Sequence, residues 1–206
     1  WNIDENKAEN YGRYMHNGGY IEPSMKKNLL FVGTLYEKKG IKTLLQAYID
    51  AQKIIAELPQ LHIVGDGDDA LRLKQFVVDN NLTERIIFHG AIYDENELSA
   101  HFKRALLCVS PHQAGLSVSK SMGYGVPFVT YKESITGGER YHITHGENGI
   151  LYEKDSDLVD IIIEASNNPN KYIEMGSRAK SYYDSNATPE HMAQGAIDAI
   201  NFVLNK

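Results

Sequence analysis

Residues 28–69 read NLLFVGTLYEKKGIKTLLQAYIDAQKIIAELPQLHIVGDGDD, and this stretch decides the fold. It begins with a short apolar run, LLFV at 29–32, that ends at Gly33, and it closes with a second run, LHIV at 61–64, that ends in GDGD. Between the two runs, residues 41–55 carry apolar side chains at helical spacing. Two short apolar strands on either side of an amphipathic helix predict a βαβ unit with parallel strands.

The same unit recurs along the chain. Further apolar runs lie at 85–88, 106–109, 127–130 and 149–152, and the helical stretches between them lie at 70–78, 95–104 and 117–123. Repetition of strand, turn and helix predicts a parallel sheet covered on both faces. Because parallel connections are right-handed, we expect a doubly wound, Rossmann-like α/β fold with three α/β/α layers.

The two ends of the chain differ from this core. Residues 1–27 are polar, and we interpret them as an N-terminal extension or linker. From about residue 155 the pattern is helical only, and Pro189 directly after Thr188 is typical of a helix start. We therefore expect one domain at 28–206 that ends in a tail of three helices, the last of them strongly amphipathic.

Composition limits the classes of function. The 206 residues carry a net charge of −6, which argues against nucleic acid as a partner because nucleic-acid-binding proteins usually present a basic surface. No apolar run approaches the roughly 18 residues of a spanning helix. The single cysteine, Cys108, excludes a disulfide framework and fits a reducing, cytoplasmic compartment. The opening WNIDENKAEN lacks a methionine and a signal-peptide pattern, so we expect a fragment of a longer protein.

Ligands of such sheets bind beyond the carboxyl ends of the strands, where four loops stand out. In FVGTLYEKKG at 31–40, Gly33 allows close approach of the backbone, and Lys39 opens a helix whose N-terminus attracts phosphate, with Lys38 as a second cation. A tight turn with solvated lysines remains the alternative. In VGDGDD at 64–69, two glycines favour a nucleotide loop, and a turn with a helix cap is the alternative. The full dinucleotide fingerprint is absent, which makes an oxidoreductase unlikely.

The third loop, within SPHQAGLSVSKSMGYGVPFVT at 110–130, turns around Gly115 and opens a helix where Ser117 and Ser119 offer hydroxyl and N–H groups to a diphosphate. Small residues for close helix packing are the alternative. The fourth loop, ESITGGERYHITHGENG at 133–149, is long and polar. Its His142 and His145 have no third ligand at a diagnostic spacing, so the sequence predicts no metal site.

Together these pieces resemble the C-terminal domain of the family 4 glycosyltransferases, also called glycosyl transferases group 1, a retaining family with the two-domain GT-B architecture. The resemblance runs from about residue 29 to about residue 152. It rests on the order of the motifs: F-x-G, then K-G opening a helix, V-G-D-G, I-I-F-H-G, S-P with G-L-S-V and G-V-P-F-V, and finally G-x-N-G-x-L-Y. Each motif is weak alone, but their common order is specific.

The resemblance implies a site for a nucleotide-sugar donor, such as a UDP- or GDP-sugar, with no metal and no separate cofactor. Contacts to the diphosphate are implied for Gly33, Lys39 and the backbone N–H groups of Gly115, Leu116 and Ser117. The nucleotide pocket would be lined by Gly65 and Gly67, the base would lie against His89 and Gly90, and the ribose would lie near Lys120.

Three positions depart from the family pattern. Thr34 stands where the family usually has an arginine, and His112 and Lys120 stand where it has two glutamates eight positions apart. The first glutamate normally touches the donor sugar and the second the ribose. We hypothesise that Lys120 contacts the diphosphate instead and that Glu139 restores a carboxylate at the sugar, which together with Lys39 gives the candidate catalytic residues.

The implied reaction is retaining transfer of a hexose-type sugar to an acceptor hydroxyl, in bacterial polysaccharide or glycoconjugate synthesis. The acceptor, a glycan or a lipid-linked glycan, would bind an N-terminal domain that this sequence lacks, so we expect the chain alone to be inactive. The full-length protein would work in the cytoplasm, at the inner face of a membrane. A non-catalytic nucleotide-sugar-binding module and a GT-B sugar-nucleotide epimerase remain alternatives.

Overall fold

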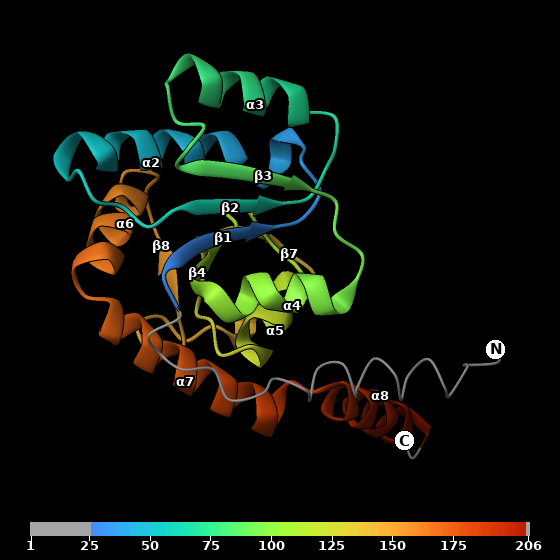
Figure 1. Cartoon of the computed structure of the whole chain (residues 1–206). Coiled ribbons are helices and arrows are strands. Elements are labelled where there is room, and N and C mark those ends of the chain that lie inside the picture. The colour runs from blue at the N-terminus through green and yellow to red at the C-terminus, as the bar shows by residue number, and fades with distance from the viewer. Residues whose placement is uncertain (1–25, 205–206) are drawn as a thin grey trace.

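The computed structural model describes residues 26–204, so nearly all of the predicted N-terminal extension lies outside the described part. Six parallel strands form one sheet in the order β3-β2-β1-β4-β6-β8 (Figure 1). The strands are β1 (Asn28–Val32), β2 (Leu61–Val64), β3 (Ile86–Gly90), β4 (Ala105–Val109), β6 (Phe128–Tyr131) and β8 (Gly149–Tyr152). The order changes direction between β1 and β4, the switch point at which such sheets bind ligands.

Helices cover both faces of the sheet (Figure 1). Core side chains of one face come from α2 (Ile41–Ile54), α3 (Ala70–Asp79) and α6 (Asp157–Asn167). Those of the other face come from α4 (Glu95–Arg104) and α5 (Ser117–Gly123), and α7 (Pro169–Asn186) contributes to both cores. The predicted Rossmann-like, three-layer fold is confirmed.

Strand alternation explains the two cores. In β1, Leu29 and Phe31 belong to one core and Leu30 to the other, and all three side chains are buried. Successive side chains of a strand point to opposite faces, so a sheet covered on both sides needs apolar residues at every position. Each such side chain contributes roughly 1.5–3 kcal/mol when fully buried. This is why the central strands are continuous apolar runs.

The loops at the carboxyl ends have structure that the sequence pattern does not predict. The short strands β5 (Gln113–Ala114) and β7 (Ile135–Thr136) pair in parallel and tie the third loop to the fourth. Two 3-10 turns, η2 (Glu37–Lys39) and η3 (Glu139–His142), shape the first and fourth loops.

The helical tail is confirmed as α6, α7 and α8 (Pro189–Leu204). No residue of α8 is buried, and its apolar side chains are exposed: Met192, Ile197, Ile200, Phe202, Val203 and Leu204. The apolar side chains of α8 therefore do not pack on the sheet of this chain. Within residues 26–204, no helix has the length and apolar character needed to span a bilayer.

Candidate functional site

The first loop brings Gly33 and Lys39 together at the end of β1. Gly33 has a φ of 154°, and the Lys39 Nζ lies 3.6 Å from the point where a Cβ on Gly33 would be. Lys39 ends η2, and Gly40, with a φ of 71°, turns the chain into α2. The structure thus places a cation and the N-terminus of a helix beside the end of β1, as the first motif predicts.

Electrostatics link Lys39 to the fourth loop. Burial lowers the pKa of the Lys39 ammonium below its ordinary value, and the charge of Glu139 opposes this shift. The Glu139 carboxylate itself accepts hydrogen bonds from the Gly137 N–H at 2.9 Å and from the Thr136 hydroxyl at 3.2 Å. A carboxylate is therefore held within electrostatic range of the lysine, although 100 positions separate the two residues in the sequence.

The second loop packs against the first, backbone to backbone. A Cβ on Gly65 would lie 1.8 Å from the Gly33 carbonyl oxygen, and one on Gly67 would lie 2.5 Å from the Leu35 oxygen. The Gly65 N–H also donates to the Gly90 oxygen at 2.7 Å. These two glycines therefore join the ends of β1, β2 and β3, in addition to any part they have in lining the predicted nucleotide pocket.

The third loop contributes His112, which stands in place of the first family glutamate. The His112 ring lies against Gly40, where a Cβ would be 2.6 Å from the ring Cγ. The backbone N–H of His112 donates to the backbone oxygen of Lys39 at 3.3 Å. Its Nε2 lies 3.6 Å from a carboxylate oxygen of Asp155. A cavity of about 540 Å³ opens beside His112 and is lined by side chains from the first, third and fourth loops and from the segment after β8.

The start of α5 is open to solvent. Leu116 is 76% exposed, and no heavy atom lies within 4 Å of the Cβ position of Gly115. The first N–H groups of a helix have no partner within the helix, so those of Leu116 and Ser117 are available to a ligand, whereas the Val118 N–H donates to the Gly115 oxygen at 2.9 Å. Ser119, in contrast, is buried, so its hydroxyl does not reach an external diphosphate as the sequence pattern suggested.

Lys120, in place of the second family glutamate, forms an ion pair. Its Nζ lies 2.7 Å from Oε2 of Glu95, the first residue of α4, and both side chains are about three-quarters buried. The Tyr124 hydroxyl donates to the other oxygen of Glu95 at 3.4 Å. Sequence reasoning missed Glu95 because its partners lie 25 and 29 positions away.

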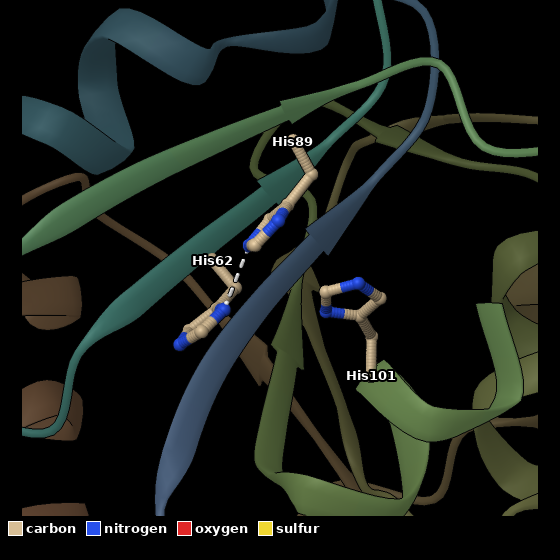
Figure 2. A group of neighbouring side chains, drawn as sticks. All are labelled: His62, His89 and His101. Carbon is tan, nitrogen blue, oxygen red and sulfur yellow. Dashed lines mark hydrogen bonds between the residues drawn. The ribbon is translucent and has the colours of Figure 1, made fainter. Parts of the chain in front are cut away.

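The structure places the remaining predicted site residues in different surroundings. Thr34 is exposed beside Gly33, and Gly90 ends β3 with a φ of 74°. The imidazole of His89 turns toward His62 and His101 on the α4 side of the sheet (Figure 2), which leaves its backbone rather than its ring for a base. The histidines of the fourth loop bond elsewhere, His142 to the Tyr182 hydroxyl and His145 to the Leu151 N–H.

A larger cavity lies away from these loops. Its volume is about 870 Å³, and its lining comes from β8, α6, α7 and the adjoining loops. None of the residues predicted to bind the donor lines it, and its position is not at the carboxyl ends of β1 and β4. The candidate site is therefore the open edge formed by the first, third and fourth loops.

Comparison with known proteins identifies the family of the chain. The family model described as glycosyl transferases group 1 matches residues 19–182. An uncharacterised glycosyltransferase of Methanocaldococcus jannaschii is 30% identical over 166 residues, which cover 78% of this chain and 41% of that protein. The N-acetyl-alpha-D-glucosaminyl L-malate synthase of Bacillus anthracis is 27% identical over 158 residues, which cover 75% of this chain and 40% of that enzyme.

Among solved structures, a mutant of S. aureus TarM in complex with Fondaparinux, α-GlcNAc-glycerol and UDP superposes with a TM-score of 0.76. The match covers 87% of this chain and 36% of that one, at 22% identity, and shows a common fold. The chain spans about two fifths of the length of the curated relatives that it matches. The family model covers most of the chain, and the predicted motifs meet at one edge of a Rossmann-like sheet, so the chain belongs to the glycosyl transferases group 1.

Proposed function

We propose that this chain is the donor-binding domain of a retaining glycosyltransferase and that it binds a UDP-sugar at the carboxyl ends of β1 and β4. The observation that carries the proposal is the position of Lys39, whose ammonium lies beside Gly33 and within electrostatic range of Glu139. A half-buried lysine at the end of a strand, with its pKa lowered by burial, gains most from an anion that neutralises it.

The diphosphate lies between Lys39 and the first turn of α5 in this proposal. The lysine supplies a full positive charge, and the backbone N–H groups at Gly115, Leu116 and Ser117 supply hydrogen-bond donors. Thr34 adds an exposed hydroxyl where the family usually has an arginine. The site therefore holds fewer cations than the family pattern.

The reaction breaks the bond between the anomeric carbon and the diphosphate oxygen and forms a bond from that carbon to an acceptor hydroxyl. The hydroxyl proton leaves with the products, and the anomeric configuration is retained. Lys39 and the α5 amides stabilise the negative charge that develops on the departing diphosphate, the electrostatic role that lowers such barriers. In this proposal Glu139, whose charge acts on Lys39, is the carboxylate on the sugar side of the site.

The carboxylate of Glu95 takes the place of the missing second glutamate. It lies 2.7 Å from the Lys120 ammonium, so an acidic group remains beside the position where the family contacts the ribose. In this proposal Lys120, which pairs with Glu95, positions that carboxylate, and contact of Lys120 with the diphosphate is the alternative.

UDP and an N-acetylhexosamine are the first donor components to test. The B. anthracis relative is named for an N-acetylglucosaminyl product, and the TarM structure holds α-GlcNAc-glycerol and UDP. The acceptor would bind a second domain opposite this edge, so transfer would need the full-length protein. We place that protein in bacterial polysaccharide or glycoconjugate synthesis, in the cytoplasm at the inner face of a membrane.

A thermal-shift screen of the chain with UDP, GDP, ADP and their common sugar conjugates tests the proposal. A ligand that binds only the folded state stabilises it by about 2.7 kcal/mol at a hundredfold excess over its dissociation constant. We expect a shift with UDP and UDP-sugars and none with ADP at the same concentration. Equal melting temperatures with and without every nucleotide would contradict the proposed donor site.

A second candidate function is a nucleotide-sugar-binding module without catalysis. It is favoured by His112 and Lys120, which replace both family glutamates with basic side chains that lie beside Asp155 and Glu95. Donor binding by the full-length protein, with neither transfer nor hydrolysis of the donor, would support this candidate over the transferase.

A further inference from the structure

Three histidines from separate elements meet on the α4 side of the sheet. His62 lies in β2, His89 in β3 and His101 in α4. One nitrogen of each ring can be chosen so that the three atoms all lie within 4.8 Å of one another. Figure 2 shows the His101 ring extending from α4 toward the rings of the two strand residues. His89 belongs to the I-I-F-H-G motif, but neither the family motifs nor the proposed donor site accounts for His62 and His101.

The fold explains why the three rings meet. Leu61 and Ile63 point into the core under α2 and α3, so His62 between them points to the opposite face. The register between β2 and β3 shifts after Ile63, because Ile63 pairs with Phe88 and Val64 pairs with Gly90. His89 is thus the extra residue of a bulge, and bulges commonly redirect a side chain.

The distances suit one metal ion after small side-chain rotations. His62 Nδ1 and His89 Nε2 are 2.9 Å apart, and the His89 and His101 ring centroids are 4.3 Å apart. Imidazole nitrogens bind zinc at about 2.0–2.1 Å, and two tetrahedral ligands on one ion are therefore roughly 3.3 Å apart. The His89 ring is exposed and the His101 ring is partly exposed, so both have room to turn.

Burial lowers the pKa values of the three imidazoles. Burial, together with the neighbouring histidines and Arg104, lowers the pKa of His62 to about 4. The pKa values of His89 and His101 are also lowered, with burial as the main cause.

The surrounding charges are mixed. Glu97 precedes His101 by one helical turn, and its charge opposes the lowering of the pKa values of His89 and His101. Arg104 acts in the opposite direction on His62 and His101. A carboxylate beside three imidazoles suits a dication of borderline softness.

We propose that His62, His89 and His101 form a binding site for a divalent transition metal, with zinc as the foremost ion. The three imidazoles are the protein ligands, and the fourth position is open to water or to the Glu97 carboxylate. The bound ion ties β3, the edge strand, to α4. This proposal does not depend on the donor site, and no described residue of the Lys39 region takes part in it.

The test is zinc titration of the whole chain, freed of any polyhistidine tag and pretreated with a chelator. We expect binding of one Zn²⁺ per chain by calorimetry and a rise in melting temperature that the chelator reverses. Co²⁺ in place of Zn²⁺ should give the intense visible absorption of a tetrahedral nitrogen site. Each of the variants His101→Ala and His89→Gln should lower zinc affinity by more than about tenfold, since even outer-sphere partners contribute 10–100-fold.

His145→Ala is the matched control, because His145 is an exposed histidine outside the cluster. Its zinc affinity should equal that of the unaltered chain. Two variants of the cluster are used so that a folding defect in one leaves the other to decide, with circular dichroism as the check of folding. The proposal is overturned if zinc does not bind, or if binding persists unchanged in a folded His101→Ala or His89→Gln variant.

Discussion

The Lys120 ammonium lies 2.7 Å from the Glu95 carboxylate, which joins α5 to the start of α4 beside the donor edge. Family members usually carry a glutamate at the position of Lys120. Here an acidic group from a different element, α4, pairs with the lysine. In the proposed function, this carboxylate takes the place of the glutamate near the ribose.

This arrangement predicts different effects for the two partners. Glu95→Gln should weaken UDP binding by roughly tenfold, about the contribution of one hydrogen bond to a charged group. Lys120→Gln should change UDP affinity less, because the lysine acts through Glu95. Calorimetric titration of each variant with UDP measures both effects. A larger loss in Lys120→Gln than in Glu95→Gln would show that the lysine itself binds the donor.

The charge-reversed pair supplies a second prediction. Each of Glu95→Lys and Lys120→Glu alone should lower the free energy of unfolding, because it places like charges side by side. The double variant should recover most of that loss. The pair is partly buried, and its own contribution is about 1 kcal/mol, so the comparison needs denaturant titrations of all four proteins. Additive losses in the double variant would mean that the two charges do not interact in solution.

We predict that a side chain at Gly65 strains the backbone and destabilises the fold. In Gly65→Ala the new Cβ would lie 1.8 Å from the Gly33 carbonyl oxygen, so the ends of β1 and β2 must separate. We expect a loss of unfolding free energy of about 3 kcal/mol or more, typical of severe strain at a special backbone position. Gly195→Ala is the control. Gly195 lies in α8 with no atom within 4 Å of its Cβ position, and alanine there should stabilise the helix by roughly 0.5–1 kcal/mol.

We predict that the Cys108 thiol is unreactive until the protein unfolds. Burial raises the pKa of this thiol from 9.0 to about 12, so almost no thiolate forms in the folded state at pH 8. Because its pKa is raised, the protonated Cys108 thiol contributes to the free energy of unfolding. This contribution is complete below about pH 9 and is lost as the pH rises toward 12. Labelling with a thiol reagent at pH 8 should therefore follow unfolding by denaturant. Rapid labelling of the folded chain would contradict the buried position.

We predict that Lys39 favours binding of the donor but lowers the stability of the free chain. Because burial lowers the pKa of Lys39, its charge is disfavoured in the folded chain without ligand. Lys39→Met should therefore keep or raise the melting temperature of the free chain. The same variant should show a smaller increase in melting temperature with UDP than the unaltered chain shows. A clear drop in the stability of the free chain would instead give Lys39 a structural role.

The sequence predicts the sheet well because its signal is local. The apolar runs at 29–32 and 61–64 need only their own alternation and the glycines after them to be identified as buried strands. The β5–β7 pair escapes such reasoning, since two strands of two residues each have no periodicity. Lys39 and Gly33 are predicted together because one short loop carries both.

Contacts that bring distant elements together are not predictable in this way. His62, His89 and His101 have no recognisable ligand spacing in the sequence, and only the parallel order of β2 and β3 with α4 beside them brings the rings together. The same is true of Glu95 and Lys120. His142 and His145, in contrast, are near each other in the sequence but bond to different partners in the fold.

The most direct test of the donor site is a calorimetric titration of this chain with UDP, compared across the unaltered protein, Lys39→Ala and Lys38→Ala. Lys38 is the exposed neighbour of Lys39 and controls for loss of one positive charge on the same turn. We predict measurable UDP binding that Lys39→Ala weakens at least about tenfold, the value of one charge-assisted hydrogen bond, and that Lys38→Ala leaves nearly unchanged. Equal UDP affinity in all three proteins, or none in the unaltered chain, would contradict the account.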